Sequence, residues 1–294
     1  MVGAAEGGSS LMHVLITGAG GQLGIDLVAV CTAAGDEVHA FDRASLDVAD
    51  RSQVFDAIAD LQPEIVFNCA AWTAVDACES DPTRAHDTNG MAVRHIAEAC
   101  HRSYAHLIQL STDYVFDGTL DRAYRETDAT NPQSEYGRSK LFGEQEALTV
   151  GSGATVVRTS WVCGRNGSNM VKTVMRLADE REQLSFVSDQ VGNPTFTQDL
   201  APMLRTIALD RVSGIVHATN QQSCSWFEFA QAVVSAMGKD PAMVLPITTA
   251  ELQPPRPAPR PANSVLDNAV LRAAGYPPMR DFHEPLAETV NALL

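Results

Sequence analysis

The stretch HVLITGAGGQLGIDLVAVCTAA, residues 13–34, decides the fold class of this chain. Its first five residues are mostly apolar and β-branched and do not alternate with polar ones, which is typical of a strand buried on both faces. Glycines follow at once, and apolar residues at helical spacing come after them. Glycine lets the backbone turn tightly and approach a pyrophosphate, which then meets the N–H groups at the start of the helix. An ordinary turn would also contain glycines, but a strand before it and a helix after it favour dinucleotide binding.

Further β-type runs repeat this rhythm, with apolar residues at helical spacing between them. Such alternation predicts a parallel sheet covered by helices on both faces, a doubly wound α/β fold of the Rossmann type. The runs are EVHAF (37–41), EIVFN (64–68), HLIQL (106–110) and ATVVRT (154–159).

The chain is long enough for a second, smaller domain. We expect an NAD(P)-binding Rossmann domain over residues 12–162, completed by 188–222, where GIVHAT resembles another strand of the sheet. Residues 163–187 and 223–294 then form a C-terminal substrate-binding domain, with helices near 168–181 and from about Ser225.

The ends and the loops are predicted from composition. Residues 1–11 carry no strand or helix pattern and are expected to be disordered. The Pro-rich segment LQPPRPAPRPANS, residues 252–264, is expected to be an extended loop, because proline has no N–H donor for a helix or a central strand.

Composition indicates which partners and which compartment to expect. The 294 residues have a formal net charge of −15 and no Lys/Arg-rich run, so nucleic acid is an unexpected partner. No run approaches the ~20 apolar residues of a membrane span. The 6 cysteines form no C-x-x-C pair, which is typical of a reducing compartment. We therefore expect a cytoplasmic protein.

The end of the second predicted strand indicates a cofactor. Asp42 follows the glycines by about 20 residues, where a carboxylate can accept from the adenosine ribose of NADH. Arg43, next to it, could instead meet the 2′-phosphate of NADPH. Both residues could also be a solvated pair at a strand end, so the choice between the two cofactors stays open.

Three residues in order along the chain have the chemistry of ketone reduction. Thr112 follows HLIQL at the carboxyl edge of the sheet, where ligands bind in this fold class. Tyr136 and Lys140 are four residues apart on a predicted helix and share a face. A charged Lys140 would favour the phenolate of Tyr136, which has an ordinary pKa near ~10, and Thr112 would hold the carbonyl oxygen.

The chain resembles the dTDP-4-dehydrorhamnose reductases, which are extended short-chain dehydrogenases, from about Met12 onward. The matching stretches are GAGGQLG (18–24), NCAAWTAVDACE (68–79), STDYVFDG (111–118), YGRSK (136–140), RTSWV (158–162), DQVGNPT (189–195) and RPANSVLD (260–267).

The resemblance implies site residues. With the glycine turn and the strand-end pair, the cofactor-binding set is Gly18, Gly21, Gln22, Leu23, Gly24, Asp42, Arg43, Asp47, Ala71, Trp72, Thr73, Tyr136 and Lys140. Thr112, Asp113, Tyr136 and Trp161 would face the sugar, and the alternative for Trp161 is a core residue at the end of a strand. Asn89 would support the cofactor or Lys140.

Two arginines of the Pro-rich loop, Arg256 and Arg260, are expected to bind the substrate's diphosphate, because guanidinium offers paired donors to phosphate oxygens. Some relatives hold a divalent ion with glutamates at positions that correspond here to Asp26 and Gln198. A neutral amide weakens such a site, so magnesium is uncertain and we predict no metal site. A monomer and a homodimer both remain possible.

The function implied by the resemblance is NAD(P)H-dependent reduction of the 4-keto group of dTDP-4-dehydro-6-deoxy-L-mannose to dTDP-L-rhamnose, with the nucleotide sugar as the partner. A nucleotide-sugar dehydratase or epimerase is an alternative, but dehydratases of this superfamily usually carry Thr-Asp-Glu where Tyr114 follows Asp113 here. A further alternative is a non-catalytic regulatory subunit, since the β subunit of methionine adenosyltransferase resembles the same reductases.

Overall fold

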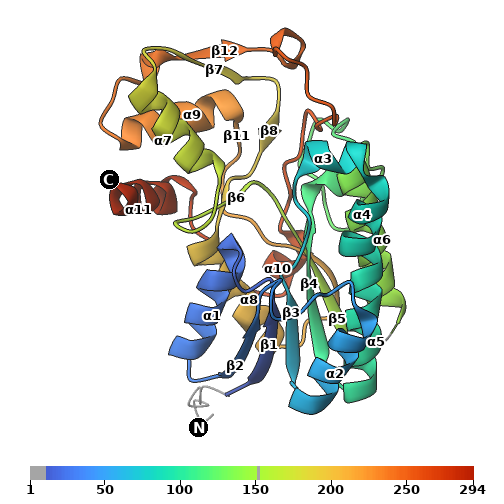
Figure 1. The fold of residues 1–294 in the computed structure, drawn as a ribbon. Coiled ribbons are helices and arrows are strands. Elements are labelled where there is room, and N and C mark those ends of the chain that lie inside the picture. Colours follow the sequence, from blue (N-terminus) through green and yellow to red (C-terminus); the bar gives the residue numbers. More distant parts are fainter. Residues whose placement is uncertain (1–10, 151–152) are drawn as a thin grey trace.

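A sheet of six parallel strands forms the centre of the computed structural model, which describes residues 11–150 and 153–294 (Figure 1). The prediction that residues 1–11 are disordered lies outside the described residues, except for Leu11. The strands lie in the order β2-β1-β3-β4-β5-β10. They are β1 (His13–Thr17), β2 (Glu37–Phe41), β3 (Ile65–Asn68), β4 (His106–Thr112), β5 (Ala154–Thr159) and β10 (Gly214–His217).

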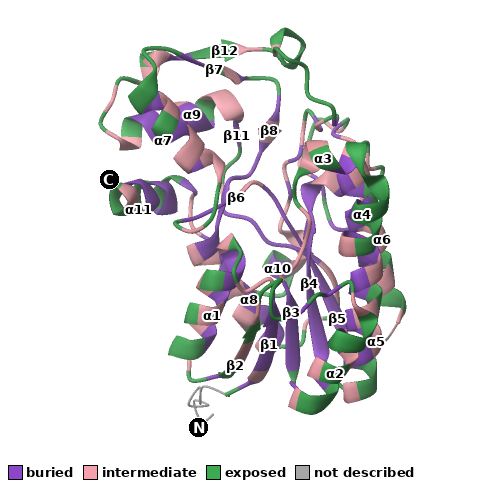
Figure 2. Cartoon of the chain, in the orientation of Figure 1, coloured by how far each residue is buried: buried purple, intermediate pink, exposed green. Residues whose placement is uncertain are grey.

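Helices cover both faces of the sheet, and the central strands are buried between them (Figure 2). One face packs on α1 (Gln22–Ala33) and α8 (Thr197–Leu209). The other packs on α2 (Arg51–Leu61), α5 (Ala92–Ser103) and α6 (Glu135–Thr149). The predicted doubly wound α/β fold is therefore confirmed.

The strand order reverses at β1, which has β2 on one side and β3 on the other. In open parallel sheets a ligand binds outside the carboxyl ends of the strands at such a reversal. The glycine turn follows β1 at this point. GIVHAT supplies β10, which pairs in parallel with β5 although a long excursion of the chain separates the two strands.

The segment between β5 and β10 and the C-terminal part of the chain together form a second apolar cluster away from the sheet (Figure 1). Ser225 and Glu228 form a capping box at the start of α9, and Asn169 caps α7, so both predicted helices are confirmed. The elements here are α7 (Met170–Glu180), β7 (Leu184–Val187), α9 (Trp226–Ala236), β12 (Val244–Ile247) and α11 (His283–Leu293).

The remaining helices and strands are short, and some of them lie between the sheet and the second cluster. The Pro-rich loop returns from η4 and pairs with β8, and α10 packs on β10, so Leu271 and Met279 join the core of the sheet rather than the second cluster. These elements are α3 (Val75–Ser80), α4 (Pro82–His86), η1 (Asp87–Met91), η2 (Asp113–Val115), β6 (Val162–Cys163), β8 (Val191–Gly192), β9 (Thr195–Phe196), β11 (Cys224–Ser225), η3 (Pro241–Met243), η4 (Thr249–Glu251) and α10 (Ala269–Ala273).

Among the helices of the described ranges, none is both long enough and apolar enough to span a membrane.

Candidate active site

The glycine turn after β1 has the form of a phosphate cradle. Gly18 has a φ of +67°, and a Cβ there would lie 2.6 Å from the backbone nitrogen of Ala70. A Cβ on Gly24 would collide with the Gly18 carbonyl, so glycine is required at both positions. No side chain caps the start of α1 at Gly21. The N-terminal N–H groups of this helix can therefore receive a phosphate.

A cavity of about 950 Å³ opens beside this turn and has room for a dinucleotide. Several expected cofactor residues line it: Gly18, Gly21, Asp42, Arg43, Asp47, Ala71 and Trp72. The other expected residues lie outside its lining. The Leu23 side chain faces the core, the Gln22 side chain accepts from Asn169, and Thr73 is exposed on the following loop.

The loop after β2 presents both candidate specificity residues to this cavity. The Oδ1 atom of Asp42 accepts from the backbone N–H groups of Ala44 and Ser45 and from the Ser45 hydroxyl. These hydrogen bonds lower the pKa of Asp42 below its ordinary value, and the bond from the Ser45 hydroxyl has the largest effect. The carboxylate is therefore fixed and charged. Arg43 is exposed beside it, so the preference between NADH and NADPH remains open.

One charged residue that lines the cavity, Arg84, was not predicted. The Arg84 guanidinium lies 4.3 Å from the centre of the Trp72 ring and lines the cavity. It is on the short helix α4, outside every motif quoted above. Its position depends on a contact with a ring in the preceding loop, which the sequence pattern does not indicate.

Asn89 fastens the Trp72 loop to α6. Its side chain accepts from the Trp72 N–H at 2.8 Å and donates to the Trp72 carbonyl and to the Ser139 hydroxyl, each at 3.0 Å. Ser139 is the neighbour of Lys140. Asn89 therefore holds the Trp72 loop directly and affects Lys140 only through the helix.

The three expected catalytic residues gather at the carboxyl end of β4. Ser134 caps α6, and one face of this helix presents Tyr136 and Lys140. Tyr136 is buried, and burial raises the pKa of its phenol above the ordinary value, while a hydrogen bond with Thr112 acts in the opposite direction. Thr112 ends β4. The Thr112 hydroxyl and the Tyr136 phenol therefore lie close together, at a place where a substrate carbonyl could bind.

Lys140 is buried, and its Nζ donates to the Leu110 carbonyl at 2.6 Å. Burial lowers the pKa of Lys140 to about 8. The Leu110 carbonyl also accepts from Gln109, whose side chain in turn accepts from Asn68. Asn68 accepts from the Thr17 hydroxyl at the end of β1. A chain of buried hydrogen bonds thus connects the glycine turn to Lys140.

Sequence reasoning missed Glu144, which follows Lys140 by one turn of α6. Its carboxylate takes two hydrogen bonds from Arg158, at 2.9 and 2.7 Å, and one from Ser111 at 2.5 Å. Both members of the ion pair are buried. The negative charge of Glu144 opposes the effect of burial and raises the pKa of Lys140. This pair was not predictable, because Arg158 lies in the RTSWV stretch whereas Glu144 lies outside every matching stretch.

Asp113 is buried rather than open to a sugar. Its carboxylate accepts from Thr112 and from Ser160, each at 2.9 Å, and from Ser264. Burial raises the pKa of this carboxyl above its ordinary value. The residue connects β4, the segment after β5 and the Pro-rich loop, and it orients the Thr112 hydroxyl. Contact of Asp113 with a sugar stays a prediction.

Trp161 is partly exposed and has a positive φ of 45°. One face of its indole stacks on Trp226, with ring centres 3.5 Å apart and planes 6° from parallel. That face packs in the second apolar cluster. A sugar could therefore use only the other face or an edge of the ring.

The two arginines of the Pro-rich loop differ in the structure. Arg260 forms a two-pronged ion pair with Asp76 of α3, at 2.5 and 2.8 Å, and its side chain is 10% exposed. Arg256 is exposed and has no hydrogen bond or ion pair within the described ranges. Arg256 is thus the freer cation, while Arg260 holds the loop against the Rossmann part.

The residues considered for a divalent ion have other partners. Asp26 accepts from Asn166 at 3.0 Å, and Gln198 donates to Glu288 at 2.7 Å. The absence of a metal site at these positions stays a prediction.

Comparison with known proteins identifies the family of the chain. Residues 12–294 match the family described as RmlD substrate binding domain. A dTDP-4-dehydrorhamnose reductase of Streptomyces griseus is 42% identical, over 95% of this chain and 93% of the relative. A probable dTDP-4,6-dihydroxy-2-methyloxan-3-one 4-ketoreductase of Streptomyces antibioticus is 43% identical, over 96% of each chain.

A solved structure shows the same fold over the whole length. It is a dTDP-4-dehydrorhamnose reductase of Bacillus anthracis in complex with NADP, with a TM-score of 0.92, 36% identity and coverage of 96% of this chain and 100% of the other. The family match and the relatives each extend over nearly all of the sequence. The chain therefore belongs to the RmlD substrate binding domain family and, within the extended short-chain dehydrogenases, to the dTDP-4-dehydrorhamnose reductase family.

Proposed function

We propose that this chain reduces the 4-keto group of dTDP-4-dehydro-6-deoxy-L-mannose to give dTDP-L-rhamnose, with NADPH or NADH as the reductant. The proposal depends on one observation: Tyr136, Thr112 and Lys140 lie together at the carboxyl edge of the sheet, beside a glycine cradle and its cavity. The names of the two relatives differ in the sugar but agree on a dTDP-linked 4-keto substrate.

When bound, the reduced nicotinamide supplies a hydride for a carbonyl carbon. Residues of the chain supply the proton that the carbonyl oxygen receives. The Thr112 hydroxyl, turned from Asp113 to the substrate, and the phenol of Tyr136 hold the carbonyl oxygen. The phenol gives its proton to this oxygen as negative charge develops there. The ammonium of Lys140 stabilises the phenolate that remains. Asp113 orients the Thr112 hydroxyl before the substrate binds, and the negative charge of Glu144 favours the charged form of Lys140.

A dehydratase would need an acid where Tyr114 stands. A tyrosine there is a weak substitute, because burial raises its pKa to about 12. Its ring packs edge-on against Tyr136, with centres 5.5 Å apart. The lack of a carboxylic acid at position 114 supports a reductase over a dehydratase.

The test is the stoichiometry of cofactor oxidation. Purified protein mixed with NADPH and the dTDP-linked 4-keto sugar should oxidise one cofactor for each sugar reduced, and Tyr136→Phe should lose most of the turnover. Tyr276→Phe is the matched control, because its phenol bonds to Asp210 instead. Sugar conversion without net oxidation would establish a dehydratase or epimerase. Cofactor binding without any reaction on 4-keto-6-deoxy sugars would establish a regulatory subunit.

A further inference from the structure

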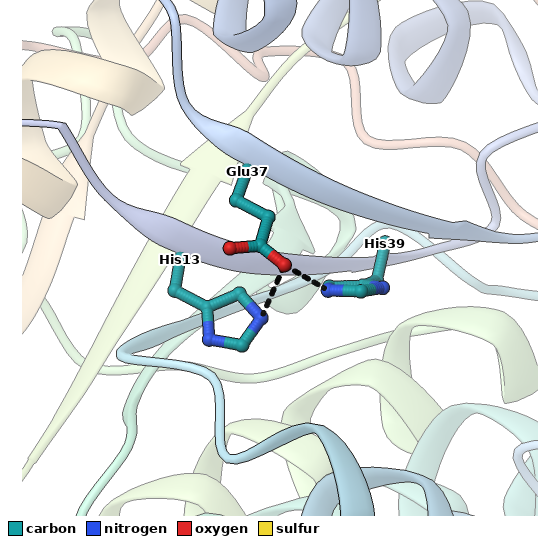
Figure 3. A group of neighbouring side chains, drawn as sticks. All are labelled: His13, Glu37 and His39. Carbon is teal, nitrogen blue, oxygen red and sulfur yellow. Dashed lines mark ion pairs between the residues drawn. The ribbon is translucent and has the colours of Figure 1, made fainter.

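Three side chains with no part in the proposed reaction lie together at the amino end of the sheet (Figure 3). His13 begins β1, and Glu37 and His39 are on the edge strand β2. The parallel register places His13 beside Glu37, and residues two apart in a strand point to the same face. The three side chains therefore share one face of the sheet, although no spacing in the sequence connects them.

The separations of their donor atoms approach those of a metal site. Oε1 of Glu37 lies 3.7 Å from Nε2 of His13 and 3.4 Å from Nε2 of His39. One donor atom from each of the three residues lies within 4.8 Å of the others. A tetrahedral zinc ion with ligands at about 2.0–2.2 Å holds them about 3.4 Å apart. Small rotations of partly exposed side chains would close the remaining distance.

The two imidazole nitrogens have no other partner. Neither Nε2 atom is reached by solvent, and neither makes a hydrogen bond to any residue within the described ranges. Both point at the same carboxylate oxygen (Figure 3). A buried polar nitrogen without a partner is unfavourable, and one ion between the three groups would satisfy both rings.

We propose that His13, Glu37 and His39 form a binding site for a divalent zinc ion. Two imidazoles and one carboxylate are donors that zinc prefers, and water would complete the tetrahedron on the open side, where the Glu37 side chain is 71% exposed. The site lies at the opposite end of the strands from the cofactor cavity. A bound ion would join β1 to the edge strand β2 and stabilise the folded chain, because it binds a pair of strands that exists only after folding.

The experiment uses the full chain without a histidine tag, stripped of metal by a chelator. Titration with Zn²⁺ by calorimetry should show one equivalent, and Zn²⁺ should raise the thermal unfolding midpoint. Co²⁺ should give the visible absorption bands of tetrahedral coordination. His39→Gln and Glu37→Gln should each weaken Zn²⁺ binding at least tenfold. Neither residue lines the cofactor cavity, so unchanged reductase activity in both variants would show that they fold.

The matched control is His283→Gln, which removes another surface histidine next to a carboxylate, 2.7 Å from Asp281. This variant should bind Zn²⁺ as the parent does. Absence of a stoichiometric Zn²⁺ site in the parent, or equal Zn²⁺ affinity in the parent, His39→Gln and Glu37→Gln, would overturn the proposal.

Discussion

Two charged residues determine much of the expected chemistry, and each is fixed by its surroundings. Lys140 is enclosed and donates to a backbone carbonyl, whereas Asp42 is at the surface and accepts from its own loop. The first has a lowered affinity for its proton because water is excluded. The second keeps its charge because three donors surround one oxygen.

The pKa of Lys140 predicts an alkaline limit to ketone reduction. Since burial lowers this pKa to about 8, we expect kcat/KM to be constant below that pH and to fall above it, as Lys140 loses the charge that stabilises the Tyr136 phenolate. A pH profile of cofactor oxidation measures this limit. Lys172→Met, at a partly exposed lysine on α7, should show the same decline. A flat profile from pH 7 to 9.5 would remove Lys140 from the mechanism.

The charge of Asp42 predicts an effect on cofactor choice. Asp42→Ala removes a carboxylate that would repel a 2′-phosphate, while Arg43 stays in place, so the NADPH/NADH ratio of kcat/KM should rise severalfold. Asp56→Ala on α2 removes the same charge outside the cavity and should leave the ratio unchanged. An unaltered ratio in Asp42→Ala would mean that this residue is not at the ribose.

Among the elements, α6 contributes most of the site. Tyr136, Lys140 and Glu144 follow one another at intervals of four residues, so all three lie on one face of the helix. The first two are the pattern that the sequence shows. The third couples the helix to β4 through Ser111 and to β5 through Arg158.

Glu144→Gln should therefore have two separable effects. It leaves the Arg158 charge buried without its counter-ion, which should lower the free energy of unfolding by about 3–5 kcal/mol. It also removes the negative neighbour of Lys140, so the alkaline limit of kcat/KM should move to lower pH. Urea unfolding and the pH profile measure the two effects.

A double variant distinguishes packing from electrostatics. Glu144→Met with Arg158→Met replaces the buried pair by apolar side chains of similar length and should recover much of the lost stability. The alkaline limit should stay shifted, because Lys140 still lacks its neighbour. Recovery of both properties together would reduce Glu144 to a structural role.

At the scale of single elements, the sequence could predict only features that depend on neighbouring residues in the chain. The bounds of β1, β2 and β5 match the predicted runs, and the pairing of Tyr136 with Lys140 needs only the helical repeat. The connections of Glu144 with Arg158 and of Asp76 with Arg260 join residues 14 and 184 positions apart. No local pattern indicates that such charges are buried together, so these contacts appear only in the folded chain.

At the scale of the whole molecule, buried histidines should limit stability in acid. Burial lowers the pKa of His106 to about 4 and that of His217 to about 3. Both values lie below the ordinary 6.5, so between these pH values the unfolded chain binds protons that the folded chain does not. Stability conferred by the neutral rings is therefore complete above pH 6.5 and is lost as the pH falls below it.

Between pH 7.5 and 5, each of these histidines should lower the free energy of unfolding by about 2 kcal/mol. Urea unfolding at the two pH values measures the sum. His217→Gln should lose its share of this dependence, whereas His283→Gln, at an exposed ring, should keep it. Equal stability of the parent at both pH values would contradict the assignment.

The pairing of β10 with β5 has a consequence for how the chain is made. On the ribosome, β5 is complete long before Gly214 is translated, so the growing sheet carries a bare hydrogen-bonding edge while α7 to α8 are being made. A nascent chain released in this interval would expose that edge to its neighbours. The first half of the gene would therefore encode a sheet that ends in the bare edge of β5, because the last strand is encoded beyond α8.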